Sequence, residues 1–334
     1  MLIVWSLIFI VSLALLIKGA DWFVESSEQI GVVLKISPFI IGVTIVALGT
    51  SLPELASSLA AVFKDATEIV AANVVGSNIA NILLIVGLSA LATKSFLAVR
   101  RSLIDIDLPL LASVTVLFGF ILWDGKITWL EGLLLLLAFL VYLFYTFFQR
   151  EAEPEEPLPE ELPPGEIFEV LPSRIERRKV KTPIEKLNFK VFLFLILGVA
   201  CLTIGANYLI DSVLKLAEIL GIGVSVIAIL AVAVGTSLPE LVVSVRAAAQ
   251  KKYEIALGNI FGSNVFNALV VIGIPAMIKP LLVDDITFKI GFPFMVVATL
   301  LLVISGITRR ISIWEGSMFL LIYILFVAKV FGWF

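Results

Sequence analysis

Residues 49–54 read Gly-Thr-Ser-Leu-Pro-Glu, and the same six letters return at residues 235–240. The same offset of 186 residues carries the Gly-Ser-Asn-x-x-Asn stretch that ends at Asn81 onto the one that ends at Asn267. Both copies lie in long apolar runs, where a carboxylate is costly unless it faces a cavity, a partner or an ion. Two polar clusters that repeat with the same spacing therefore indicate a duplicated unit, in which the buried Glu, Ser and Asn side chains have a function.

The composition indicates a membrane protein. The chain has 334 residues, of which 60% are hydrophobic and 15% charged, and its mean hydropathy is +1.11. The apolar runs are long enough to cross a bilayer core of about 30 Å. A single cysteine, Cys201, excludes an internal disulfide, and the lack of histidine excludes imidazole metal ligation and histidine acid–base chemistry. The apolar N-terminus lacks a basic start and a small-residue cleavage site, so we expect a membrane helix there rather than a cleaved signal peptide.

Apolar segments between charged or Gly/Pro-marked breaks predict ten helices. An odd number of crossings in each copy inverts the second copy, which is the architecture of many secondary transporters. We therefore predict an all-α membrane protein of ten transmembrane helices in two inverted five-helix repeats, residues 1–148 and 190–334, joined by a linker over 149–189. The helices are expected at about 2–24, 38–63, 69–93, 103–123, 127–148, 190–210, 224–249, 255–278, 286–307 and 312–333.

The loop charges predict the orientation. Lys and Arg are more frequent in the loops that share a side with the linker, even when the basic residues of the linker itself are left out. The positive-inside rule then places the linker in the cytoplasm and both termini outside the cell membrane. The linker begins acidic, ends basic and has too few apolar residues to fold alone. It is either a solvated tether with a basic topology anchor or a segment that senses cations or the membrane surface.

Helical spacing gathers the repeated polar side chains. Ser51 and Glu54 are three residues apart, and Ser77 and Asn81 are four apart, so each pair shares one face of a helix, and the same holds for the second copy. The proline before each glutamate lacks an N–H and clashes with the carbonyl four residues earlier, which is expected to free backbone carbonyls at membrane depth. Facing helices could then point these oxygen atoms at one central space.

The groups on these faces are all oxygen donors. Two carboxylates, two Asn amides, four Ser hydroxyls and several carbonyls suit Ca²⁺ or Na⁺ and not Zn²⁺ or Cu⁺. The two carboxylates balance one Ca²⁺ or two Na⁺, and competition for one site is the physical basis of exchange. The alternative is that Glu54 and Glu240 are buried partners of basic residues, yet no Lys or Arg is expected at their depth.

Other polar residues have structural interpretations. Asp21 and Asn207 are expected near helix ends at the membrane interface, and Glu131 and Glu315 near helix starts, where a carboxylate suits the helix dipole. An isolated asparagine in a membrane helix often joins it to a neighbouring helix instead of binding a ligand. Both interpretations are open for Asn73, Asn78, Asn259 and Asn264.

The repeated motif closely resembles the two alpha-repeats of the Na⁺/Ca²⁺ exchanger family, within the cation/Ca²⁺ exchanger superfamily. The resemblance covers essentially the whole membrane part, but the linker is much shorter than the regulatory loop of the animal exchangers and would lack their Ca²⁺-binding domains. It implies a site between the second, third, seventh and eighth helices. It also implies that the first and sixth helices slide against the rest to alternate access.

The resemblance also implies roles for individual residues. Some prokaryotic members carry Asp where this chain has Asn267, so a protonatable group is not expected there. The Ca²⁺ ligands would be two carboxylates and two backbone carbonyls: Glu54, Glu240, Thr50 and Thr236. The Na⁺ sites would use four hydroxyls and two backbone carbonyls, those of Ser51, Ser77, Ser237, Ser263, Ala47 and Ala233. Two amides, Asn81 and Asn267, would complete the central position.

The leading functional prediction is a secondary active antiporter that exchanges Na⁺ for Ca²⁺ without K⁺. The K⁺-dependent exchangers of the superfamily carry Asp at the position of Asn267, whereas the K⁺-independent animal branch carries Asn. The alternative is H⁺/Ca²⁺ antiport, although that branch usually has a Gly-Asn-x-x-Glu type of motif. An ion channel is a rival of another class, but the inverted duplication favours alternating access.

No enzyme activity is expected. The sequence has no nucleophile–base pair, no metal-activating histidines and no phosphate-binding glycine loop. We expect Ca²⁺ and Na⁺ as transported ions, a lipid bilayer as the surroundings, no cofactor, no nucleic acid and no obligatory protein partner.

Overall fold

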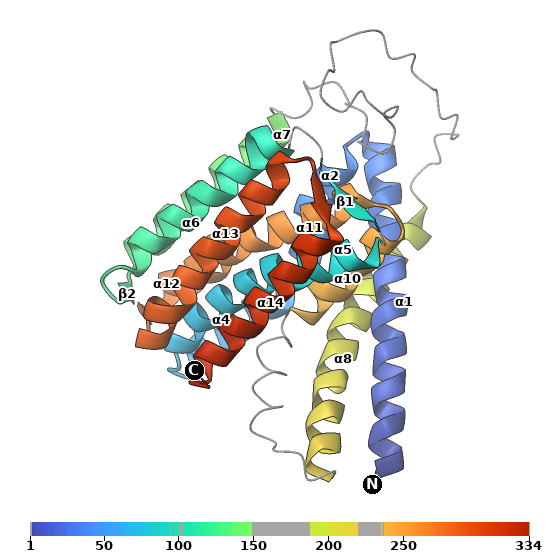
Figure 1. Ribbon diagram of the computed structural model, residues 1–334, viewed down its shortest axis with the longest axis horizontal. Helices are drawn as coiled ribbons and strands as arrows, with labels where there is room; N and C mark the ends of the chain where they lie inside the picture. Colours follow the sequence, from blue (N-terminus) through green and yellow to red (C-terminus); the bar gives the residue numbers. More distant parts are fainter. Residues whose placement is uncertain are drawn as a thin grey trace.

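Figure 1 shows the computed structural model, in which a long pair of helices, α1 and α8, lies beside a bundle formed by the other helices. The structure describes residues 2–93, 95–99, 103–148, 188–219, 235 and 237–333. Residues 149–187 of the predicted linker and much of the first half of the seventh predicted helix therefore lie outside the described residues.

The two halves contain elements in a matching order. The first half consists of α1 (Leu2–Leu34), α2 (Pro38–Ile41), the π-helical turn η1 (Gly42–Val46), α3 (Ala47–Phe63), α4 (Glu68–Ile79), η2 (Ala80–Ile85), α5 (Val86–Ala92), β1 (Phe96–Ala98), η3 (Leu103–Asp107), α6 (Leu108–Leu122), β2 (Lys126–Ile127) and α7 (Trp129–Phe148). The second consists of α8 (Phe189–Ile219), α10 (Leu238–Ala249), α11 (Tyr253–Phe266), η5 (Asn267–Val271), α12 (Ile272–Ile278), β3 (Leu281–Leu282), η6 (Thr287–Gly291), α13 (Phe292–Ile307), β4 (Arg310–Ser312) and α14 (Ile313–Val330).

The chain is an all-α membrane protein, as predicted. Among the described residues, eight helices are long and apolar enough to cross a bilayer, and α6 is a shorter apolar helix. Helix α10 is the described part of the seventh predicted segment, so each of the ten predicted segments contains a described helix.

Two predicted helix ends are wrong. The first helix was expected over 2–24 and the sixth over 190–210, but α1 continues to Leu34 and α8 to Ile219. The apolar runs do end near the predicted positions, but polar residues that favour helices follow them, and no proline interrupts α1 before Pro38. As a result, Asp21 lies inside α1 and Asn207 lies inside α8, and neither is near a helix end as expected.

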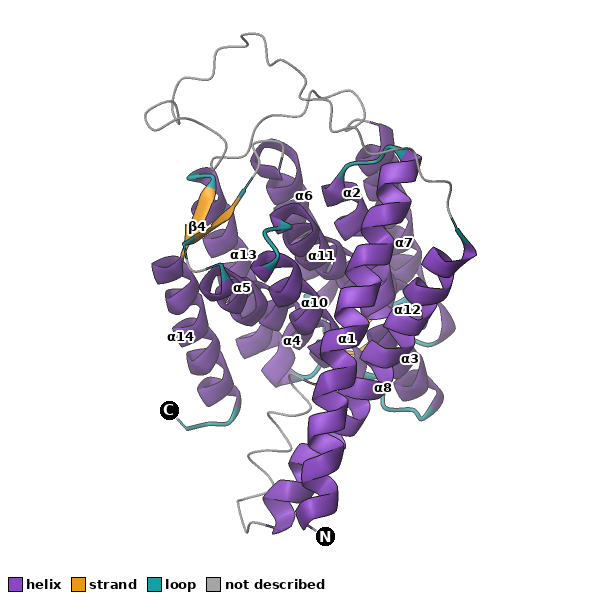
Figure 2. Ribbon diagram, turned by 90° about the vertical axis from the view of Figure 1, so that its right-hand side faces the viewer, coloured by secondary structure: helices purple, strands orange, loops and turns teal. Residues whose placement is uncertain are grey.

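Helices α1 and α8 run antiparallel and lie side by side in both views (Figures 1 and 2). Small residues allow their backbones to approach closely. A Cβ atom added at Gly19 would lie 2.8 Å from the Cβ of Cys201, and one added at Gly205 would lie 3.0 Å from the carbonyl oxygen of Ser12. Close approach at glycine is a common way for membrane helices to pack, because lipid offers no hydrophobic drive for association. The two helices therefore form one packed pair.

Two short antiparallel sheets also join the repeats. Strand β1 pairs with β4, with Leu97 opposite Ile311, and β2 pairs with β3, with Ile127 opposite Leu281. No strands were expected from the sequence, because segments of two or three residues have no periodicity of their own. Each sheet takes one strand from each half, so the sheets link the two repeats.

Candidate functional site

The repeated polar residues lie in four helical regions that pack on one another: α3, α4 with η2, α10, and α11 with η5. These are the second, third, seventh and eighth predicted segments. The side chains of Glu54 and Glu240 are both 0% exposed. The other predicted site side chains in the described part of the chain are also buried: Ser51, Ser77, Ser237, Ser263, Asn81 and Asn267.

Irregular turns of helix accompany the polar residues. The π-helical turn η2 begins one residue before Asn81, and η5 begins at Asn267 itself. A third such turn, η1, leads directly into α3. Such turns are rare and often mark functional sites, because they displace the regular backbone hydrogen bonds. Sequence reasoning missed them, since it placed uninterrupted helices over these residues.

A hydrogen bond between the repeats holds one of the two glutamates. The hydroxyl of Ser51 on α3 donates to Oε1 of Glu240 on α10 at 2.8 Å. A second bond joins α3 to α11, because the hydroxyl of Thr50 donates to Oδ1 of Asn259 at 3.0 Å. The amide of Asn259 donates in turn to Ser244 at 2.8 Å. Asn259 thus joins helices, which is the structural interpretation that the sequence left open.

The remaining oxygens of the glutamate pair are unpartnered. Among the described residues, both carboxylate oxygens of Glu54 and Oε2 of Glu240 have no hydrogen-bond partner. The two carboxyl groups lie within Coulombic range of each other. A buried carboxylate without a compensating partner is strongly disfavoured. These oxygens are therefore available to a cation.

Neutral polar atoms lie unpaired in the same helical regions. In the described part of the chain, the hydroxyls of Ser237 and Ser263 and the whole amide groups of Asn81 and Asn267 have no partner. The described residues hold no group of three or more His, Cys, Asp or Glu side chains that could form a metal cage. A cation here would therefore be bound by two carboxylates together with hydroxyl, amide and backbone oxygens, a set that suits Na⁺ or Ca²⁺.

The side chain of Asn78 joins two helices, and that of Asn264 bonds within its own helix. The amide of Asn78 donates to the backbone carbonyl of Asn264 at 3.1 Å, and the amide of Asn264 donates to the carbonyl of Ile260 at 2.7 Å. The sequence left both a ligand role and this structural role open for them. The amide nitrogen of Asn78 thus joins α4 to α11 through the backbone of Asn264, whereas the amide nitrogen of Asn264 bonds within α11 itself.

Glu315 and Glu131 begin helices, as expected. Glu315 forms a capping box with Ser312 at the start of α14. Glu131 accepts a hydrogen bond from the backbone N–H of Thr128 at 2.7 Å near the start of α7. Two other predicted site residues, Thr236 and Ala233, lie outside the described residues, so their positions stay predictions.

A family model described as "Sodium/calcium exchanger protein" matches residues 4–148 and 190–332. The chain belongs to the sodium/calcium exchanger family. This confirms the resemblance inferred from the repeated motif, and it places the chain among membrane antiporters rather than enzymes.

Relatives and a solved structure agree with this assignment. The chain is 35% identical to "Sodium/calcium exchanger MaX1" of Methanosarcina acetivorans, over 99% of each chain. It is also 35% identical to "Putative antiporter CaxA" of Alkalimonas amylolytica, over 97% of each. A solved structure of the sodium–calcium exchanger NCX_Mj superposes with a TM-score of 0.78 at 31% identity, covering 99% of this chain and 100% of that one. All three comparisons cover nearly the whole chain, and the structural one supports the membrane exchanger fold.

Proposed function

We propose that this antiporter exchanges Na⁺ for Ca²⁺ across the cell membrane by alternating access, without K⁺. The observation that carries the proposal is the glutamate pair. Glu54 and Glu240 are fully buried, and three of their four carboxylate oxygens have no partner among the described residues. A pair of negative charges in an apolar bundle needs a counter-charge, and no basic side chain of the described residues supplies it.

The same pair explains why two ions would exchange. Two carboxylates balance one Ca²⁺ or two Na⁺, so either load leaves the site close to neutral. A neutral loaded site can pass through an apolar barrier, whereas the empty doubly negative site resists that step because charge is costly at low dielectric. Competition for one site, combined with this barrier, couples the two fluxes.

We assign the individual ligands on the same grounds. Ca²⁺ would be bound by Glu54, Glu240 and the backbone carbonyls of Thr50 and Thr236. The Na⁺ sites would use Ser51, Ser77, Ser237, Ser263 and the carbonyls of Ala47 and Ala233, with Asn81 and Asn267 at the centre. The unpaired hydroxyls of Ser237 and Ser263 and the unpaired amides of Asn81 and Asn267 support this assignment.

We propose the predicted domain organisation and orientation as well. Residues 1–148 and 190–334 would form the repeats, and residues 149–189 would form a cytoplasmic linker, with both termini outside the cell. The excess of Lys and Arg on the linker side supports this topology. A cysteine introduced near Glu156 should react with impermeant reagents only from the cytoplasmic side, and labelling from outside intact cells would reverse the orientation.

H⁺/Ca²⁺ antiport is the second candidate, because two buried carboxylates within Coulombic range could also be neutralised by protons. Purified protein in liposomes separates the candidates. We expect Ca²⁺ uptake under an outward Na⁺ gradient and none under K⁺ or H⁺ gradients of equal size. Uptake driven by the H⁺ gradient alone would replace Na⁺ with H⁺ as the coupling ion.

A further inference from the structure

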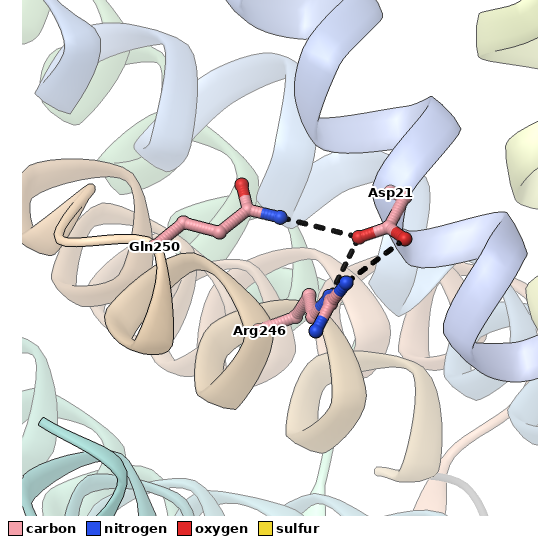
Figure 3. Close-up of polar contacts among 3 residues, drawn as sticks. All are labelled: Asp21, Arg246 and Gln250. Atoms are coloured by element: carbon pink, nitrogen blue, oxygen red, sulfur yellow. Dashed lines mark hydrogen bonds and ion pairs between the residues drawn. The ribbon is translucent and has the colours of Figure 1, made fainter.

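An ion pair connects α1 to the end of α10 (Figure 3). The guanidinium of Arg246 donates from Nε to Oδ1 of Asp21 at 2.6 Å and from Nη2 to Oδ2 at 3.2 Å. The amide of Gln250 donates to the same Oδ1 at 3.2 Å. Such two-point contact between Arg and a carboxylate fixes orientation as well as distance. The Asp21 side chain is 15% exposed and that of Arg246 is 44% exposed.

A second ion pair lies further along α1. Nζ of Lys252, in the turn between α10 and α11, lies 2.6 Å from Oε2 of Glu28. Helix α1 is otherwise packed along α8. These two ion pairs therefore connect α1 to α10, which carries Glu240, and to the turn that follows it.

Neither ion pair has a counterpart in the other repeat. At the offset of 186 residues, Asn207 stands where Asp21 would be repeated, and Ala60 stands in the place of Arg246. Ala66 likewise occupies the place of Lys252. The packing differs in the same sense, because α1 packs along α10 whereas α8 makes only slight contact with α3. The α1–α10 contact and the α8–α3 contact are equivalent by the repeat, and the ion pairs occur at the closer one, between α1 and α10.

The symmetry of the fold gives this difference a functional meaning. In an inverted-repeat transporter the two access states are related by exchanging the conformations of the repeats around a fixed site. In the second state, α1 and α10 would then take the looser arrangement that α8 and α3 have here. That arrangement separates Asp21 from Arg246. The equivalent residues, Asn207 and Ala60, cannot form an ion pair when α8 and α3 close.

We propose that Asp21, Arg246 and Gln250 are positioning residues that stabilise only the described access state. The proposal rests on the alternating access proposed above, but not on which ions are exchanged. Two states that differ mainly by exchanging the conformations of two repeats of the same fold would otherwise be close in free energy. An exposed ion pair shifts such a balance by roughly two- to fivefold, and salt weakens the effect.

The shift should be visible from both faces of the membrane. The apparent affinity for an ion falls in proportion to the fraction of protein that exposes the site to that side. Loss of the ion pair should therefore weaken apparent Ca²⁺ affinity on one face and strengthen it on the other. A general structural defect would weaken both.

Distances between spin labels test the proposal directly when they are measured with saturating Na⁺, so that the loaded protein can pass between the two access states. Labels at cysteines replacing the exposed residues Val32 on α1 and Val116 on α6, with Cys201→Ala, report how α1 sits against the bundle. The label distances should fall into two populations, one for each access state. Asp21→Asn and Arg246→Gln should each change the ratio of these populations in the same direction, by roughly two- to fivefold. Asp21→Arg combined with Arg246→Asp should restore part of the original balance.

The mirrored pair provides the sharper variant. Asn207→Asp combined with Ala60→Arg builds the missing contact between α8 and α3, and it should shift the populations in the same direction as Asp21→Asn. Lys215→Gln is the matched control, because it removes an exposed ion pair with Glu218 that lies within α8 alone. Unchanged populations in both single variants, an equal shift in the control, or a mirrored pair that acts in the opposite direction would each overturn the proposal.

Discussion

The two copies of the repeated motif have the same six letters but hold their glutamates differently. Glu240 accepts a hydrogen bond from Ser51 of the other repeat, whereas Glu54 has no partner among the described residues. Pro53 lies inside the continuous helix α3, while Pro239 lies in the first turn of α10. The duplicated motif therefore supplies the same side chains from each repeat. In any one state of the protein, however, the two glutamates have different hydrogen-bond partners.

The largest expected effect comes from the two carboxylates. Glu54→Gln or Glu240→Gln removes half of the negative charge of the site, so each should abolish Ca²⁺ transport while the fold is retained. Uptake of Ca²⁺ into liposomes measures the effect, and Glu68→Gln at the exposed start of α4 is the matched control. A well-folded Gln variant with normal uptake would remove that glutamate from the site.

Asn267→Asp should have the next largest effect. Asn supplies a neutral oxygen, so one Ca²⁺ already balances the charge of Glu54 and Glu240. A third carboxylate would crowd three like charges in a buried space, and one of them would then recruit a proton or another monovalent cation. We expect wild-type exchange to need no K⁺ and the variant to depend on K⁺ or on pH.

The measurement is Ca²⁺ uptake driven by a Na⁺ gradient, with K⁺ replaced by a large organic cation. Loss of wild-type activity on removing K⁺ would refute the prediction for Asn267 and assign the chain to the K⁺-dependent branch. Asn81→Asp is the matched variant in the other repeat, since both amides are fully buried and unpaired among the described residues.

A smaller effect should distinguish Ser51 from Ser237, the serines three residues before the two glutamates: their loss should change the stability of the protein by different amounts. Ser51→Ala leaves Oε1 of Glu240 without its donor, so it should destabilise the ion-free protein by about 1–3 kcal/mol. Ser237→Ala removes a hydroxyl that has no partner among the described residues, so it should change ion-free stability by less than about 1 kcal/mol. Thermal unfolding in detergent without Na⁺ or Ca²⁺ measures both, and equal losses would mean that the two halves are equivalent after all.

The accuracy of the sequence-based prediction varies along the chain for physical reasons. The segment 38–63 has its predicted bounds, because Ser37 caps it by accepting from Ile40, Pro38 fits the first turn, and Lys64 and Asp65 follow its last turn. Helix α1 runs past its predicted end, because the end of an apolar run is not the end of a helix.

The candidate site also has features that the sequence predicted and features that it did not. The motif and its offset identified the buried Glu, Ser and Asn side chains, because repeated polar residues in apolar helices are a strong signal. The π-helical turns were missed, since one extra residue in a helical turn leaves no pattern in the sequence. The Asp21–Arg246 pair joins residues 225 positions apart, and its only trace is a mismatch between the repeats: Asp21 against Asn207.

The smallest expected effect concerns the linker, whose acidic stretch lies between Glu151 and Glu161. If this segment is only a tether, its removal should leave Na⁺-driven Ca²⁺ uptake nearly unchanged. Deleting residues 151–161 from 149–189 leaves about 30 residues, which reach up to roughly 100 Å when extended. That length is several times the thickness of a bilayer core, and a shorter loop changes closure entropy by only about 0.3 kcal/mol. A large shift in the Ca²⁺ concentration that activates exchange would instead show that the acidic residues sense the ion, and neutralising them to Gln at full length would separate charge from length.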